Sequence, residues 1–496
     1  MGSKNLTTAK NKEIAMISYF FNALSFFRPV FSRNSPWLLF CMVIISFIGA
    51  NEMTGVTSFC RFQGLGANGY NTLLHFFRSG AWSAAMIIIQ WQTFVVAQQV
   101  TVMADGRAVL AGDHTYVPKD GRKMPGVVTL HQDSETQSKP SYFRGHQWGA
   151  ICMMVGTFTA AFGMPLSLGI HQGLEHITDE TDEEDCGNLK TRIIQMALDF
   201  AIKHNMLCIL TLDAYFPGAS VFIIANSFWS LELKKPFVTL IIRAKKNCVA
   251  YYAAKAPQGK KGPGRPKKYG EKIKLTDLFE LPHLFSTAQC QVYEKMEDIT
   301  FLAVNLFWKP TGEKIRFVLA VTSRGPIVLM CSDLCQDPLL AVRLYCLRTR
   351  IEIMFDMLKN LIGAFSYRFW SKSMPRHSRK PKKNKDLITP SSEDIKTVKL
   401  CQDAYERFTM SAAIALGLLQ LISLKYPQAV WNRFDVYLRT RSRELPSERT
   451  VKFVMTRLLV SNLCIVAPVA IIRQIKERYF RVKFNHHQSD PLNLIN

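Results

Sequence analysis

Four polar side chains in the segment 344–359 stand at spacings that a helix would bring onto one face. They are Tyr345, Arg348, Glu352 and Lys359, at offsets of 0, 3, 7 and 14. At about 100° per residue these offsets fall within about 60° of one another. A carboxylate, two cations and a phenol on one face suit phosphate and metal chemistry. The opposite face is apolar, with Leu347, Ile351, Met354 and Leu358. An ordinary amphipathic helix with a solvated charged face would show the same pattern.

Two further carboxylates stand in or at the end of apolar strands. The segment 108–116 predicts a strand that carries Asp113, followed by the turn-rich sequence PKDGRKMPG. Residues 206–213 form a second apolar run, which ends at Asp213 before the strand-breaking sequence AYFPGAS. An acid at the end of a strand often marks only the exit of the strand into solvent. Two such acids and Glu352 nevertheless supply three oxygen ligands from three separate elements, which suits Mg²⁺ or Mn²⁺.

The order of these acids, with the ungapped spacing Tyr-x2-Arg-x3-Glu-x6-Lys, resembles the DDE transposases of bacterial insertion sequences. The subgroup that it resembles is the insertion-sequence-four type. Supporting strings are GDHTYVPKDGRKMPGV around Asp113, SKPSYFRGHQWGA after it, LTLDAYFPG around Asp213, GPGRPKKYG, and SDL ahead of the expected helix. The resemblance covers about residues 36–425 and is most specific in that helix.

The resemblance implies an α/β fold in which a β-rich insertion interrupts an RNase H-like catalytic core. A helical N-terminal domain and a helical C-terminal region complete the chain. In the helical N-terminal domain, Val56–Leu65 and Asn68–Phe77 could form a DNA-binding helix-turn-helix. Two packed helices joined by glycine are also common as a purely structural motif. The expected divisions are a DNA-end-binding domain at 1–100, the core at 101–250 and 326–430, the insertion at 251–325 and the C-terminal region at 431–496.

The resemblance also implies the chemistry. The strands of Asp113 and Asp213 would lie side by side with the helix of Glu352, and the three catalytic carboxylates would hold two Mg²⁺ (or Mn²⁺) ions ~3.5–4 Å apart. The side chains that would grip DNA phosphates are Tyr345, Arg348 and Lys359. The expected activity is cut-and-paste transposition: strand cleavage at transposon ends, with a hairpin route as an option, and then strand transfer. A hairpin route needs an aromatic platform, for which Trp308 is one candidate.

The charge of the chain predicts a polyanionic partner. Sixty-two Lys and Arg against 38 Asp and Glu give a net charge of +24, which favours nucleic acid over an anionic membrane surface. Basic residues cluster in 255–274 and 372–385. The first cluster includes Arg265, Lys267 and Lys268, whose Gly-Arg-Pro context can lie in a minor groove, although a flexible basic linker has the same composition. We expect double-stranded DNA, both transposon-end inverted repeats and target, to be bound by a homodimer.

Hydropathy supplies one rival class, a polytopic membrane protein. Gly149–Ile170 is 22 residues without a charge, which is long enough to span a membrane. Its central Gly163-Met164-Pro165 predicts instead a break between two strands of a buried hairpin. Trp37–Ala50 and Ser411–Leu424 are shorter and fit core helices. We therefore expect a cytoplasmic, nucleoid-associated protein with no membrane partner, and a catalytically inactive, domesticated DNA-binding protein is the other alternative.

Overall fold

The computed structural model describes residues 2–52, 55–119, 121–131, 141–171, 188–254, 267–368, 370–374, 391–437 and 444–462. The chain divides into two compact units. The helical unit comprises Met1–Ala97, Asp356–Ser373 and Lys396–Asn496, and the sheet unit comprises Gln98–Phe355 and Met374–Ile395.

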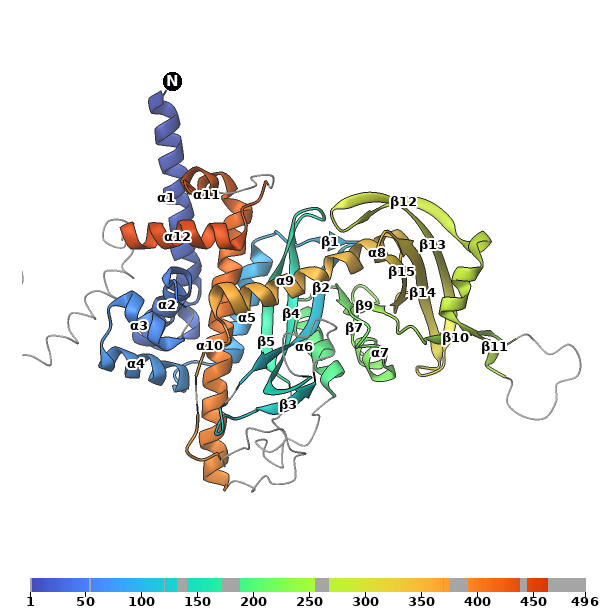
Figure 1. Cartoon of the computed structure of the whole chain (residues 1–496), viewed down its shortest axis with the longest axis horizontal. Helices are drawn as coiled ribbons and strands as arrows, with labels where there is room; N and C mark the ends of the chain where they lie inside the picture. Colours follow the sequence, from blue (N-terminus) through green and yellow to red (C-terminus); the bar gives the residue numbers. More distant parts are fainter. Residues whose placement is uncertain are drawn as a thin grey trace, which may run out of the picture. The chain divides into compact units, whose positions relative to one another are not determined.

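Helices from both ends of the chain build the helical unit, and they are blue and orange to red in Figure 1. The N-terminal elements are α1 (Gly2–Phe26), a 3-10 turn (Arg28–Val30), α2 (Asn34–Gly49), α3 (Val56–Gln63), α4 (Ala67–Arg78) and α5 (Ala84–Ala97). The later elements are a π-helical turn (Leu358–Ile362), α10 (Ser392–Lys425), α11 (Pro427–Arg433) and α12 (Glu448–Asn462).

Aromatic side chains fill the core of the helical unit. Phe408 of α10 lies at the centre of one cluster, with Phe47, Phe59, Phe77 and Tyr367 around it. Their ring centroids lie between 4.9 and 5.7 Å from that of Phe408. All five side chains are buried, so this cluster joins α2, α3 and α4 to α10 through apolar and aromatic packing.

The expected pair of short helices near the N-terminus is confirmed. Helices α3 and α4 are joined by a tight turn in which Gly64 adopts a left-handed conformation, with φ of 65°. Glycine is suited to that position because it carries no Cβ. The role of this pair in binding DNA ends stays a prediction.

The charge-free run Gly149–Ile170 forms paired strands, as predicted, but the predicted position of the break is wrong. Strands β4 (Tyr142–Gly156) and β5 (Ala161–Ile170) pair antiparallel, and the turn lies at 157–160. Pro165 continues within β5 at a shift of register opposite Ile151 and Cys152. A proline is tolerated there because it lies at a bulge, and because β5 pairs only with β4 among the described strands.

The two shorter apolar runs form helices, as predicted. Trp37–Ala50 corresponds to α2, and Ser411–Leu424 lies inside the much longer α10. By length and composition alone, Glu393–Lys425 could cross a membrane, but 89% of its most apolar window is buried inside the protein. A core helix passes the same test, and such burial is typical of one.

A 13-stranded sheet dominates the sheet unit. Its other strands are β1 (Met103–Ala104), β2 (Arg107–Pro118), β3 (Val128–His131), β6 (Cys208–Leu212), β9 (Val238–Arg243), β10 (Val249–Ala253), β11 (Tyr269–Lys274), β12 (Ser286–Val292), β13 (Lys295–Trp308), β14 (Glu313–Thr322) and β15 (Gly325–Cys331). A separate ladder joins β7 (Trp229–Ser230) to β8 (Lys235–Pro236). The α-helices are α6 (Leu189–Lys203), α7 (Ala219–Ala225), α8 (Pro338–Leu347) and most of α9 (Thr349–Met357), and 3-10 turns span Leu275–Glu280 and Pro282–Leu284.

Five neighbouring strands, in the order β5–β4–β2–β6–β9, form the centre of this sheet. Strand β4 runs antiparallel to β5 and β2, whereas β2, β6 and β9 are parallel. The antiparallel strands β10–β15 continue the sheet beyond β9, where β15 pairs with it. The chain therefore has a mixed α/β fold with a large mixed sheet, as the sequence predicts.

Helices pack closely against both faces of the central strands. A Cβ on Gly112 of β2 would lie 2.4 Å from Cγ2 of Ile193, so glycine allows α6 to approach this face. A Cβ on Gly163 of β5 would lie 2.7 Å from the backbone oxygen of Arg350, so α9 approaches β5 equally closely. Successive residues of a strand point to opposite faces, and Asp113 therefore points away from α6.

Candidate active site

Strands β2 and β6 place two of the predicted acids side by side. Their parallel register pairs Ala111 with Thr211, so Asp113 and Asp213 stand level two residues further on. Asp213 follows the last residue of β6, and its Oδ1 accepts a 2.9 Å hydrogen bond from the backbone N–H of Tyr215. Asp113 is mostly buried, with 18% of its side chain exposed. The carboxyl ends of parallel strands are a common place for active sites.

The third acid comes from α9, and the expected single helix is interrupted beside it. Helix α8 ends at Leu347, Arg348 lies between the two helices, and α9 begins at Thr349. The apolar stripe predicted for this segment is buried, at Leu347, Ile351, Met354 and Leu358. Glu352 lies in the first turn of α9, with 56% of its side chain exposed.

Arg348 joins the acids of the sheet and the helix. Its Nη1 donates a 2.9 Å hydrogen bond to Oδ2 of Asp113, and its Nη2 donates a 2.5 Å hydrogen bond to Oε1 of Glu352. Only 11% of the Arg348 side chain is exposed. One guanidinium thus bridges two carboxylates from elements that are distant in sequence.

The electrostatics of the cluster reflect burial and crowding of like charges. Burial and, after it, the charge of Asp213 raise the pKa of Asp113 to about 7, although Arg348 opposes this shift. Burial also raises the pKa of Tyr345, whereas Arg348 and Arg243 lower it. Asp113, Asp213 and Glu352 all favour the charged form of Arg348 and raise its pKa. All three predicted acids therefore act on one guanidinium.

A buried histidine pair supports the acids from the other face of β2. The ring of His114 stacks on Phe216 with centroids 5.5 Å apart, and its Nε2 lies 3.2 Å from Nδ1 of His171. Burial lowers the pKa of His114 to about 4 and that of His171 to about 3, so both rings are neutral at pH 7. Phe216 belongs to the turn after Asp213. The stacked pair therefore packs that turn against the strand of Asp113.

Three cations near Asp213 were not identified from the sequence. Arg243 ends β9 and hydrogen-bonds the side chain of Tyr345. Lys245 follows two residues later, and Lys190 lies in the first turn of α6, where both Asp213 and Lys245 act on its charge. A signal for Arg243 was present, since it ends the apolar run VTLIIR as Asp213 ends its own run.

The other residues predicted to contact DNA belong to other parts of the chain. Lys359 belongs to the helical unit, in the π-helical turn Leu358–Ile362. Lys268 pairs with Glu313 at 3.1 Å, Lys267 is exposed, and Arg265 lies outside the described residues, as does nearly all of 372–385. Their contacts with DNA stay predictions. Trp308 is only 8% exposed and packs on Phe222 of α7, so it offers no open platform.

The donor set of the cluster fits a hard divalent cation. Asp113, Asp213 and Glu352 offer only carboxylate oxygens, the ligands that hard divalent cations prefer. In the described ranges, no three His, Cys, Asp or Glu side chains stand close enough to hold a metal ion as they are. Arg348 occupies two of the three carboxylates instead. A bound divalent cation would therefore compete with the guanidinium for these carboxylates.

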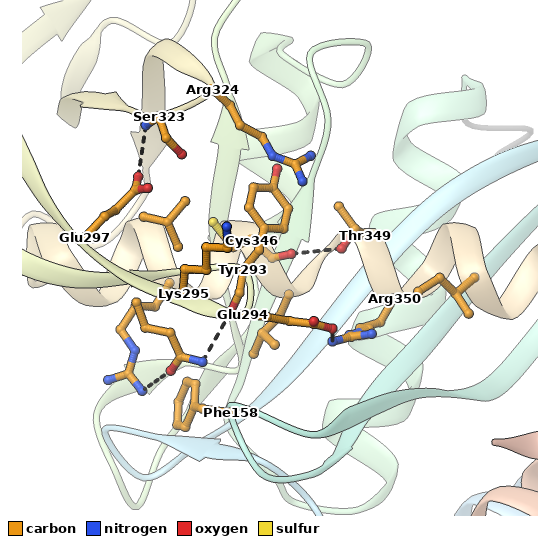
Figure 2. A pocket seen from close by; sticks show the side chains of 15 residues that line it. Phe158, Tyr293, Glu294, Lys295, Glu297, Ser323, Arg324, Cys346, Thr349 and Arg350 are labelled. Carbon is orange, nitrogen blue, oxygen red and sulfur yellow. Dashed lines mark hydrogen bonds and ion pairs between the residues drawn. The ribbon is translucent and has the colours of Figure 1, made fainter. Parts of the chain in front are cut away.

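A separate cavity of about 470 Å³ lies beside α8 and α9, and Figure 2 shows its lining. It is bounded by the β12–β13 turn, the β14–β15 turn and Phe158. Arg324 lies over the ring of Tyr293, with 3.9 Å between its Cζ and the ring centroid. Arg350 reaches Glu294 at 3.8 Å. Thr349, the residue that follows Arg348 in sequence, also lines the cavity.

Comparison with known proteins gives one family match. A family model described as "DDE superfamily endonuclease" matches residues 52–143, which include Asp113 but neither Asp213 nor Glu352. The match supports a DDE transposase-type domain of the nuclease class, for which DNA is the substrate and divalent metals are the general cofactors. A comparison with curated proteins finds no match.

The raised pKa of Asp113 predicts a pH-dependent stability. The folded protein keeps a proton on Asp113 that the unfolded chain releases, so the free energy of unfolding should fall as pH rises from about 4 to about 7. In metal-free protein, Asp113→Asn should reduce the fall in melting temperature over this range. Asp298→Asn, at an exposed position of β13, is the control. Equal pH slopes for the wild type and Asp113→Asn would contradict the assignment.

Proposed function

We propose that this protein is a cut-and-paste DNA transposase of the insertion-sequence-four type. The observation that carries the proposal is the convergence of Asp113, Asp213 and Glu352 on Arg348 from two parallel strands and a helix. The strand order β5–β4–β2–β6–β9, with the first pairs antiparallel and the rest parallel, supports an RNase H-like core. Strands β10–β15 would be its β-rich insertion, since they separate β9 from α8 in sequence.

In this proposal the three acids would hold two Mg²⁺ or Mn²⁺ ions. When bound, such ions activate the attacking oxygen and stabilise the leaving oxygen in phosphoryl transfer. Tyr345 and Arg348 would orient the phosphates beside the scissile bond, with Lys359 as a further contact. The substrates would be transposon ends and then target DNA, bound by a homodimer in the cytoplasm, at the nucleoid.

Arg348 would change partners during binding. In the free protein its guanidinium is satisfied by Asp113 and Glu352. A DNA phosphate offers the same planar pair of oxygens for bidentate hydrogen bonding. Transfer of Arg348 to the phosphate would release both carboxylates where the cations are needed. The same side chain would therefore balance the acids at rest and orient DNA during cleavage.

The cavity of Figure 2 would serve the hairpin route. A hairpin at the transposon end requires a nucleotide to leave the stack, and such a nucleotide needs a planar surface and positive charge. Arg324 and Tyr293 form a stacked cation and ring there. Lys295 and Arg350 add positive charge to the lining. Because Trp308 is buried, we assign the displaced nucleotide to this cavity instead.

Loss of any one acid should abolish Mg²⁺-dependent strand cleavage. The variants are Asp113→Ala, Asp213→Ala and Glu352→Ala, and the substrate is a plasmid that carries the DNA flanking the coding region. DNA binding should persist, because cations elsewhere supply the phosphate contacts. Asp199→Ala, on the exposed side of α6, is the control. Normal nicking by any of the three variants would refute the site, and an inactive wild type would favour a domesticated DNA-binding protein.

Arg348→Ala should slow cleavage per folded molecule by roughly ten- to a hundredfold. Loss of a charge-assisted phosphate contact costs on the order of 1.5–3 kcal/mol, which corresponds to that range of rates. Arg457→Ala is the control, because this arginine also pairs with a carboxylate, that of Asp435, but belongs to α12 and not to the acid cluster. Cleavage rate and melting temperature are measured on both variants. A lower melting temperature with near-normal cleavage by Arg348→Ala would mean that its role is only structural.

Arg324→Ala should separate nicking from hairpin formation. The first nick should keep its rate, while hairpin ends should form about tenfold more slowly, since one base-stacking contact is worth about 1–3 kcal/mol. Denaturing gels of cleavage products measure both steps. Lys309→Ala, in the β13–β14 turn outside the cavity, is the control. Unchanged hairpin yield in Arg324→Ala would show that the cavity does not hold the displaced nucleotide.

A further inference from the structure

The carboxyl ends of β6 and β9 bring three cations around Asp213. The parallel register pairs Leu212 with Ile242, so Arg243 stands level with Asp213 on the neighbouring strand. Lys245 follows β9, and Lys190 comes from the first turn of α6. We call Lys190, Arg243 and Lys245 the cationic rim. It lies on the opposite side of Asp213 from β2 and Asp113, because β6 separates β2 from β9.

Side-chain contacts hold cations of the rim in place, and the rim is exposed to solvent. The Lys190 ammonium lies 4.9 Å from the ring centroid of Tyr215. Tyr215 is itself held by the hydrogen bond from its backbone N–H to Asp213, yet 44% of the residue is exposed. Arg243 and Lys245 are exposed as well, although Arg243 also hydrogen-bonds Tyr345. Lys190 and Arg243 are therefore placed by defined contacts, and the rim remains accessible.

The charge of the rim is not balanced by nearby carboxylates. Among the described residues, none of the three cations forms an ion pair with a carboxylate within 4.0 Å. Lys190 and Lys245 lie near enough to repel each other, and Asp213 is the acid that opposes this repulsion at Lys190. Asp213 is also shared with the acid cluster. Like charges held together in this way are stabilised by an anion that binds between them.

We propose that the cationic rim binds the phosphodiester backbone of the DNA strand that leaves the acid cluster on the side of Asp213. Arg243 links the rim to Tyr345 and Arg348, so cations would line a continuous path on both sides of the acids. Arginine would grip one phosphate through two donors, and the lysines would make point contacts. Tyr215 would act as a positioning residue that holds Lys190 through its ring. This inference rests on the proposed function, because it assumes that DNA lies across the acids.

The salt dependence of DNA binding tests the rim without any cleavage step. Affinity for a short random-sequence duplex is measured in EDTA at several salt concentrations. Lys190→Gln and Lys245→Gln should each lower the log-log salt slope by about 0.9, the value for one lost phosphate contact. Lys203→Gln, in the last turn of α6 and thus at the opposite end of this helix from Lys190, is the matched control. Slopes equal to that of the control would overturn the proposal.

A second pair of variants tests the role of Tyr215. Tyr215→Phe should keep the wild-type slope, because its ring still faces Lys190, whereas Tyr215→Leu should lower the slope as Lys190→Gln does. Equal slopes for these two variants would remove Tyr215 from the proposal. A wild type that does not bind DNA would refute the proposed function together with the rim. Wild-type binding with a slope that no rim variant changes would refute the rim alone.

Discussion

A single guanidinium balances the negative charge on which the candidate site depends. Asp113 and Glu352 come from a strand and a helix more than two hundred residues apart, and Arg348 bonds to both. Without a cation, these carboxylates and Asp213 would repel one another in a poorly solvated place. Burial and the charge of Asp213 keep the pKa of Asp113 raised, although Arg348 opposes this shift. Such a site favours additional positive charge. In the resting structure, the Arg348 guanidinium supplies part of the charge that a divalent cation would bring.

The elements around the site hold this arrangement in place. The parallel register of β2 and β6 sets Asp113 level with Asp213. Gly112 lets α6 pack tightly against one face of β2, which leaves the other face to Asp113. The stacked rings of His114 and Phe216 tie the turn after Asp213 to β2. Arg348, between α8 and α9, keeps a helical backbone conformation and reaches both Asp113 and Glu352. The side chains packed on one face of β2 therefore hold the strand and the turn that carry the acids of the other face.

The sequence predicted those features that follow from local spacing. Helical periodicity gave the buried stripe Leu347, Ile351 and Met354, and two apolar runs gave the strands of Asp113 and Asp213. Prediction from the sequence failed where contacts between elements distant in sequence determine the structure. The break between the strands was predicted at Gly163-Met164-Pro165 but lies at 157–160. The proline is accommodated inside β5 because it lies at a bulge and because β4 is the single described strand that pairs with β5. The rim was missed because its cations are far apart in sequence, and only the sheet register brings Arg243 beside Asp213. Spacing likewise gave no sign that Arg348 would be paired with the acids.

We propose that three carboxylates, held at rest by Arg348, form a divalent-metal centre that DNA opens. The most direct measurement is Mn²⁺ affinity of the full-length protein, by titration calorimetry, with and without bound DNA. DNA should tighten Mn²⁺ binding in the wild type, because the phosphate would draw Arg348 away from Asp113 and Glu352. In Arg348→Ala, the affinity without DNA should already be raised, and DNA should add little. Equal Mn²⁺ affinity in the wild type with and without DNA, unchanged in Arg348→Ala, would contradict the account.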